Sequence, residues 1–141
     1  MESKQLSPIT VTTTVKASLE KAWLSFTVPE HITQWNFAAD EWQCPTAEND
    51  LTPGGKFSYR MEAKDGSSGF DFGGIYDEVK PSELLAYTMG DGRKVRVTFT
   101  PNGNQTFVEE TFDPEGTNPI EMQRDGWQAI LDNYKKHTES L

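Results

Sequence analysis

The chain has 141 residues, of which 22 are acidic and 13 are basic, so its formal net charge at pH 7 is -9. This length suits one domain with a sizeable core, and the negative charge argues against a nucleic-acid backbone or an anionic membrane surface as the partner, because both require clustered Lys and Arg. Cys44 is the single cysteine, which excludes a disulfide within the chain and indicates a packed, idle thiol.

The first segment, residues 1–7, is polar, and we expect it to form a flexible tail ahead of one domain over residues 8–141. It lacks the apolar core of a secretory signal. No stretch of the chain approaches the ~20 apolar residues of a membrane span. We therefore expect a cytoplasmic protein that does not insert into a membrane.

A strand and two short helices are predicted after the tail. In residues 9–15, β-branched apolar residues alternate with threonines, which is typical of a half-buried strand. Ser18 is placed to cap a short helix whose apolar face carries Trp23. Pro29 ends that helix and fits the first turn of a second one, which runs to about Trp35.

Beyond the two helices the chain alternates between strand-like segments and turn pairs. Asp-Gly and Asn-Gly between alternating segments are strong signals of a β-hairpin. The segments therefore form an antiparallel meander of six strands, to which the first strand adds a seventh. The predicted strands lie near residues 42–50, 56–63, 69–79, 84–90, 93–100 and 105–113.

The last predicted element is a long helix over residues 118–141, with Asn118 as its N-cap and Pro119 in its first turn. An antiparallel sheet has one face to bury, and this helix has a matching apolar stripe. We therefore predict an α+β helix-grip fold, in which the sheet curves around the helix and leaves a cavity. The stripe contains Met122, Trp127, Ile130, Leu131, Tyr134, Thr138 and Leu141.

Four segments carry a family resemblance. They are VPEHITQW at 28–35, DLTPGGKF at 50–57, GIYDEVKP at 74–81 and GWQAIL at 126–131. Their order is similar to that of the START-like, birch-pollen-allergen-like (SRPBCC) helix-grip superfamily, in the branch of the activator of heat-shock-protein-90 ATPase. The resemblance implies the same fold and a cavity for lipids, hormones, polyketides or other apolar molecules. It also implies two alternatives, a stress-related co-chaperone that contacts a chaperone partner, and an enzyme of the cyclase or hydrolase type.

Patterns for catalysis or metal binding are weak in this sequence. His31 and His137 lie far apart in the chain, and no nucleophile elbow or zinc-binding helix motif occurs, so we expect neither a metal nor another cofactor. Adjacent carboxylates such as Glu109 and Glu110 point to opposite faces of a strand and cannot act together. An enzyme is therefore the least favoured of the three functions.

Charged residues on the predicted sheet have two interpretations. Arg60 and Glu62 share one strand face, and Asp71 and Asp77 share a face of the next strand if that strand is unbroken. They are either polar groups of the cavity or part of the solvated outer face. We favour the outer face.

The binding hypothesis depends on the aromatic residues, which make up 11% of the chain. Apolar rings with a few polar tips suit a small-molecule site, although plain core packing is the alternative for each residue taken singly. Gly126, inside the long helix, marks either a close backbone contact or space for a ligand. We therefore predict non-enzymatic binding of a small hydrophobic or aromatic molecule, such as a lipid, a polyketide or a flavonoid-like compound. The expected cavity-lining residues are Trp35, Trp42, Phe57, Tyr59, Met61, Phe72, Tyr76, Tyr87, Phe99, Trp127, Ile130 and Tyr134.

Overall fold

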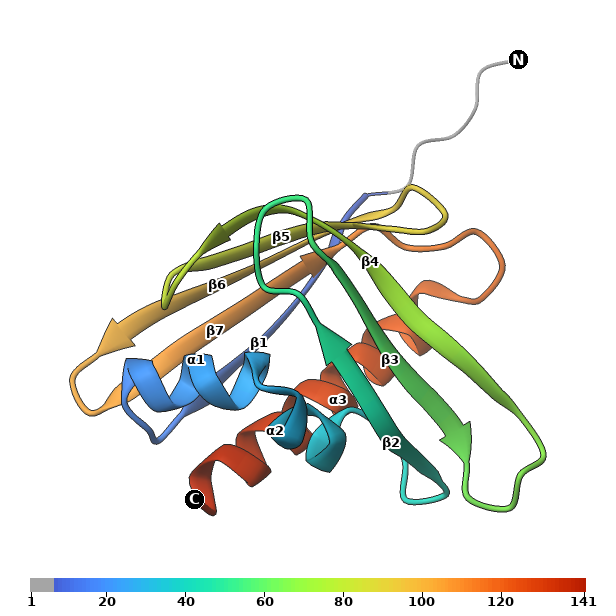
Figure 1. The fold of residues 1–141 in the computed structure, drawn as a ribbon, viewed down its shortest axis with the longest axis horizontal. Helices are drawn as coiled ribbons and strands as arrows, with labels where there is room; N and C mark the ends of the chain where they lie inside the picture. The colour runs from blue at the N-terminus through green and yellow to red at the C-terminus, as the bar shows by residue number, and fades with distance from the viewer. Residues whose placement is uncertain (1–6) are drawn as a thin grey trace.

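A computed structural model describes residues 7–141 of the chain. The predicted tail, residues 1–7, lies outside the described residues except for Ser7. The predicted order of one strand, two short helices, six strands and a long helix is confirmed (Figure 1). In chain order, the elements are β1 (Ile9–Val15), α1 (Leu19–Thr27), α2 (Pro29–Trp35), β2 (Trp42–Asn49), β3 (Lys56–Ala63), β4 (Gly69–Lys80), β5 (Leu84–Met89), β6 (Lys94–Asn102), β7 (Gln105–Phe112) and α3 (Ile120–Glu139).

The strands form one 7-stranded antiparallel sheet in the order β1-β7-β6-β5-β4-β3-β2. The run from β2 to β7 is a meander, and β1 pairs with β7 from Ile9 opposite Phe112 to Val15 opposite Thr106. The alternation predicted for β1 is present, since Ile9, Val11 and Val15 are buried. The predicted meander with an added first strand is therefore confirmed.

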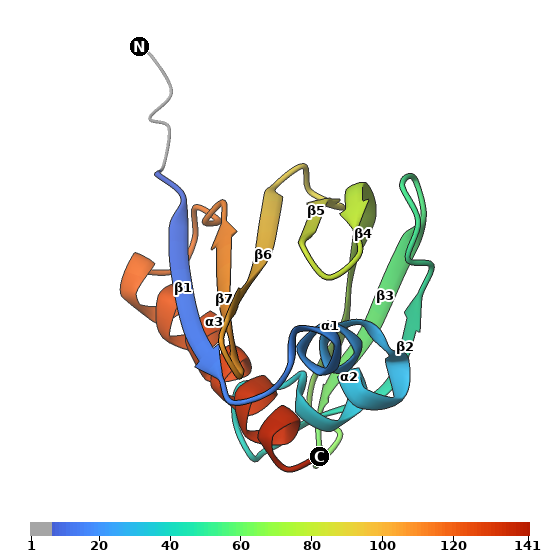
Figure 2. The ribbon, with the colours of Figure 1, turned by 90° about the vertical axis from the view of Figure 1, so that its left-hand side faces the viewer.

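The sheet is strongly curled, so that it forms a half-barrel (Figure 2). Gly73 and Gly74 of β4 lie where neighbouring strands approach closely, because a Cβ on either residue would meet a carbonyl oxygen of the next strand at 2.5 Å. Glycine inside a strand commonly marks such a tight bend. The register of β4 also shifts between Tyr76 and Glu78. These two features explain how a long strand follows the curvature.

The helices cover the concave side of the sheet. α3 runs along β1, and α1 and α2 lie at the end of the sheet where α3 finishes (Figures 1 and 2). The predicted cap of α1 is confirmed, since the backbone N–H of Lys21 donates to the Ser18 hydroxyl at 3.2 Å. Within residues 7–141, no helix combines the length and the apolar character that crossing a bilayer requires.

The first turn of α3 differs from its prediction. Asn118 does not cap the helix, because its side-chain amide donates to the Glu115 carboxylate at 3.2 Å. Met122, predicted to be buried in the apolar stripe, is 62% exposed, and so the prediction was wrong there. Gln123 is buried instead, because its side chain exchanges hydrogen bonds with the backbone of Glu115 (2.9 and 3.0 Å) and also donates to the Asn118 carbonyl (2.8 Å). The preceding loop therefore sets the rotation of this end of the helix.

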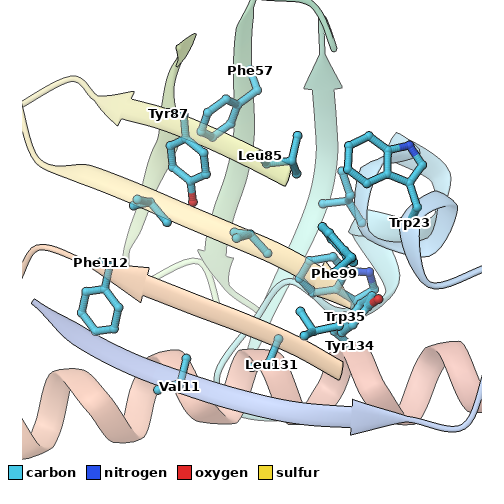
Figure 3. Packing of buried hydrophobic residues seen from close by; sticks show 14 of the residues in the cluster. Val11, Trp23, Trp35, Phe57, Leu85, Tyr87, Phe99, Phe112, Leu131 and Tyr134 are labelled. Carbon is cyan, nitrogen blue, oxygen red and sulfur yellow. The ribbon is translucent and has the colours of Figure 1, made fainter. Parts of the chain in front are cut away.

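A cluster of aromatic side chains fills the space beneath α1 and α2 (Figure 3). Neighbouring ring centroids in this cluster are 5.1 to 5.4 Å apart, and most pairs meet edge to face. The Tyr134 hydroxyl donates to the Ala22 carbonyl at 2.6 Å, and the Trp35 indole donates to the Ser25 carbonyl at 2.9 Å. The members of this aromatic core cluster are Trp23, Phe26, Trp35, Phe99 and Tyr134.

Candidate functional site

The space between the sheet and α3 is not filled beyond the aromatic core cluster. It contains a cavity of about 300 Å³, which lies at the lower end of the size range of small-molecule sites. Rings and aliphatic side chains form most of its wall, and polar groups are interspersed among them. The apolar and aromatic lining residues are Phe26, Trp35, Phe57, Tyr59, Met61, Phe70, Phe72, Tyr76, Leu85, Tyr87, Trp127, Ile130 and Leu131. The polar ones are Asn36, Arg93, Glu110, Glu115, Asn118 and Gln123.

The predicted site residues divide between this cavity and its surroundings. Phe99 and Tyr134 do not border the cavity, because they pack inside the aromatic core cluster. Trp42 lies on the outside, in a groove that adjoins the cavity. The structure brings the remaining predicted residues together around the cavity, and their contact with a ligand stays a prediction. These residues are Trp35, Phe57, Tyr59, Met61, Phe72, Tyr76, Tyr87, Trp127 and Ile130.

An outer groove adjoins the cavity beside α3, and Met61, Phe70, and Trp127 border both. Trp42 lies across the groove from Phe70, with ring centroids 6.0 Å apart. A Cβ on Gly126 would meet no atom within 4 Å. A close backbone contact therefore does not explain this glycine, and open space beside the groove remains as the explanation.

Trp127 is one of the residues that line both the cavity and the outer groove. Its ring stacks on Phe112 with centroids 3.9 Å apart and an interplanar angle of 7°, and it meets Phe72 edge-on at 6.1 Å. The residue is half-buried, and it borders both spaces. Trp127 therefore belongs both to the core and to the pocket, because one face of its ring packs on the sheet while the rest of the side chain lines the cavity and the groove.

Hydroxyl groups on the cavity wall are partly held by the protein. Tyr76 donates to Asn49 Oδ1 at 2.7 Å, and the Asn49 side chain donates in turn to the Thr27 carbonyl at 2.8 Å. Burial raises the pKa of Tyr76 to about 12, and burial also raises the pKa of Tyr59, with a further contribution from Tyr76. These hydroxyls therefore stay protonated near neutral pH and serve as hydrogen-bonding groups.

Glu110 is the buried carboxylate of the cavity. It lies on the inner face of β7 between Val108 and Phe112, and it is only 7% exposed. Among residues 7–141, no hydrogen bond or ion pair holds its carboxyl group, whose oxygens border the cavity. Burial raises its pKa to about 8. Its charge, when present, adds to the effect of burial in raising the pKa of Tyr87 on β5.

Sequence reasoning did not identify Glu110 as a cavity residue. The signal is the alternation along β7, where Thr106, Val108 and Phe112 point inward and Glu110 shares their phase. A glutamate in the inward phase of a buried strand is unusual, because ionised carboxylates are costly to bury. The other polar lining residues lie in loops or at element ends, where periodicity gives no indication of direction.

The charged residues of β3 and β4 lie on the outer face, as favoured. Arg60 forms ion pairs with Glu62 at 3.1 Å and with Asp71 at 3.6 Å, and all three side chains are substantially exposed. Asp77 is also exposed, and its carboxylate accepts a hydrogen bond from the Thr88 hydroxyl at 2.7 Å. Exposed pairs of this kind contribute at most about 1 kcal/mol each.

The histidines, far apart in sequence, meet in space. His31 Nδ1 lies 3.0 Å from His137 Nε2, although the two residues are 106 positions apart in the chain. In the part of the chain that the structure describes, no group of three or more His, Cys, Asp or Glu side chains is arranged to hold a metal ion. Cys44 is buried, and burial raises the pKa of its thiol, which opposes reactivity.

A curled antiparallel sheet that holds a long C-terminal helix and leaves an apolar cavity defines a helix-grip, START-like protein. The profile of one family, described as Activator of Hsp90 ATPase homolog 1-like protein, matches residues 16–139. The chain belongs to this family. No curated protein sequence matches the chain significantly.

Solved structures agree with this assignment. An AHSA1-like protein from Aeromonas hydrophila is 38% identical, with a TM-score of 0.90 over 95% of this chain and 93% of that one. A protein from Cytophaga hutchinsonii is 55% identical, with a TM-score of 0.81 over 94% of this chain and 92% of that one. The Aha1 dimer from Colwellia psychrerythraea is 17% identical and shares the fold, with a TM-score of 0.74 over 95% of this chain and 97% of that one.

Proposed function

We propose that the chain binds a small hydrophobic or aromatic molecule in its cavity without converting it chemically. The supporting observation is the cavity of about 300 Å³ walled by aromatic rings, directly beside a core that is densely filled. Burial of apolar ligand surface would contribute about 25 cal/mol per Å². The hydroxyls of Tyr59 and Tyr76 provide polar tips that orient a ligand within a mainly apolar wall.

The contrast between the two ends of the sheet supports the proposal. Trp23, Phe99 and Tyr134 show that this sequence packs rings tightly where a core is needed. A large apolar space left unfilled costs on the order of several kcal/mol relative to a packed core. A ligand that fills the cavity would recover part of this free energy, and it would stabilise the folded state in proportion to its concentration over its Kd.

A ligand screen with a blocked variant tests the proposal. Lipids, polyketides and flavonoid-like aromatics are added to the protein, and thermal stability and NMR shifts of the Trp127 indole are measured. Gly126→Leu places a side chain in the open space beside the outer groove, where the glycine leaves room for it. Asp125→Leu, at the exposed neighbouring position of α3, is the control. A ligand of the cavity is expected to change the melting temperature and the Trp127 indole signal of the wild type and the control, and to change those of Gly126→Leu less. No response to any apolar class contradicts the proposal.

A second candidate function follows from the family name and from the surface around the outer groove. We propose as the alternative that the chain contacts an Hsp90-type chaperone, as the family description suggests. Phe70 and Met122 beside the groove are 48% and 62% exposed, which is unusual for large apolar side chains and suits a protein contact. The test is the ATPase rate of the Hsp90 homologue from the same cell. Contact is supported if the wild-type chain changes this rate and the double variant Phe70→Ser, Met122→Ser does not. Contact is rejected if the wild-type chain leaves the rate constant.

A further inference from the structure

We infer that the molecule held in the cavity carries a protonatable amine, which pairs with Glu110 while its apolar body lies among the aromatic rings. The inference rests on the proposed binding function and adds the chemical class of the ligand. Its starting point is a carboxyl group that is buried, borders the cavity and has no partner among the described residues.

The side chains next to Glu110 on the adjacent strands cannot pair with its carboxyl group, so a partner must come from the cavity. In the sheet, Val11 of β1 and Val97 of β6 are its neighbours on either side, and neither can form a hydrogen bond through its side chain. Tyr87 is the titratable group that faces it from β5. From α3, the side chains that line the cavity are Gln123, Trp127, Ile130 and Leu131, and none of them is charged.

The other charged groups of the cavity already have partners. Arg93 Nε donates to the Asp91 carboxylate at 2.7 Å, and Arg93 also reaches the Asp113 carbonyl at 3.4 Å. Glu115 accepts hydrogen bonds from the backbone N–H groups of Thr117 at 3.1 Å and Asn118 at 2.6 Å. Glu110 therefore remains as the charged lining residue that a ligand can satisfy. Among the described residues, no side-chain oxygen or nitrogen is both sealed from solvent and unpaired, so the Glu110 oxygens are open to the cavity, where a ligand or water can pair with them.

The surroundings of Glu110 favour a cation over a neutral hydroxyl. The rings of Tyr59, Phe72, Tyr87 and Trp127 border the same cavity, and aromatic faces attract an organic ammonium group. The net charge of -9 raises the local concentration of cations around the chain. A carboxyl group, aromatic rings and a negative electrostatic field together favour the binding of an amine.

Binding of an amine moves one proton. Burial raises the pKa of Glu110 to about 8, so the empty cavity holds mainly the neutral carboxylic acid at pH 7. When an ammonium ion enters, the O–H bond of that acid breaks, the proton leaves to the solvent, and a carboxylate–ammonium pair remains. Removing this proton at pH 7 weakens the apparent affinity about tenfold relative to the ionised site. The affinity for an amine therefore rises with pH until the carboxyl group is ionised.

A matched pair of probes tests the inference. Naphthylmethylamine and naphthylmethanol share their ring system and differ in the amine, and calorimetry in buffers of different ionisation enthalpy counts the protons released. At pH 7 we expect the amine to release close to one proton and the alcohol none. Below the pKa of Glu110, the amine affinity rises by up to about tenfold per pH unit. The alcohol affinity shows no such rise.

Glu110→Gln isolates the carboxyl group, and Glu109→Gln makes the same change on the outer face of the same strand. Glu110→Gln is expected to abolish proton release and lower amine affinity at least tenfold, with alcohol affinity changed less than twofold. Glu109→Gln behaves like the wild type. Equal affinity of both probes for the wild type, without proton release, overturns the amine inference and leaves the proposed function standing. Failure of both probes to bind overturns the inference, and the ligand screen described above then decides whether the proposed function stands.

Discussion

The rings of His31 on α2 and His137 on α3 lie against each other at an interplanar angle of 58°, with Nδ1 of His31 3.0 Å from Nε2 of His137. One nitrogen donates and the other accepts, which requires that at least one of the two rings is neutral. The contact joins α2 to the last turns of α3, next to the hydroxyl hydrogen bond of 2.7 Å between Ser25 and Thr138 that joins α1 to α3. The histidine pair therefore helps to hold the short helices against the long one.

Mild acid is expected to weaken this contact. Burial, and secondarily the charge of His31, lower the pKa of His137 below its ordinary value. The unfolded state therefore binds the proton more readily, so the stabilisation is present above about pH 6.5 and is lost as the pH falls through the lower folded-state value. Urea unfolding of the wild type at a series of pH values is expected to show this decrease, and His137→Gln is expected to show a smaller one. A variant with an unchanged pH dependence would contradict the role of the pair.

The opposite pH dependence is expected for the buried carboxyl group. The pKa of Glu110 is raised to about 8, so between about pH 4.5 and 8 the folded state holds a proton that the unfolded state has lost. The stabilisation is therefore complete below about pH 4.5 and is lost as the pH rises to about 8, to a limit of about 5 kcal/mol. Glu110→Gln should match the wild type in acid and exceed its free energy of unfolding at pH 8 to 9. Glu109→Gln, unfolded in the same series, should show no such gain.

The elements of the fold were predictable because their signals are local. Turn pairs marked the hairpins, and Gly66, Gly92 and Gly103 do adopt the positive φ that such turns require, at 79°, 91° and 63°. Strand alternation and helix caps depend on neighbours within a few residues. The rotation of α3 at Met122 was not predictable in this way, because it depends on the hydrogen bonds of Gln123 with a loop.

The site was predictable only as a set of inward-facing rings. Phe57 and Phe99 follow the same inward alternation, yet Phe57 borders the cavity while Phe99 packs under α1. The difference arises from where the short helices lie, which no strand pattern encodes. The same holds for the histidine contact, which joins residues 106 positions apart. The isolated carboxyl group of Glu110 also became apparent only when its surroundings were known.

Removal of the Trp127 side chain should cost less than removal of a core ring. Full truncation of a buried aromatic residue costs about 3–5 kcal/mol, but Trp127 is half-buried and borders the cavity, so its contacts are concentrated in the stack on Phe112. We expect Trp127→Ala to lower the free energy of unfolding by about 2–3 kcal/mol. Tyr134→Ala, in the aromatic core cluster, should lower it by more. Chemical denaturation of both variants in one buffer measures the difference, and equal losses would place Trp127 in the core.

The glycine of α3 offers a test that separates stability from ligand access. A Cβ at Gly126 meets no atom within 4 Å, so Gly126→Ala should raise the free energy of unfolding by about 1 kcal/mol through helix propensity. Gly126 therefore makes the folded state less stable than alanine would, and the open outer groove beside it is a reason for a glycine at this position. If the groove is the ligand's path, Gly126→Ala slows ligand association and Gly126→Leu slows it further. Stopped-flow quenching of the intrinsic tryptophan fluorescence, to which Trp35 and Trp127 on the cavity wall contribute, measures these rates. A stabilised variant with wild-type association rates would show that the ligand enters elsewhere.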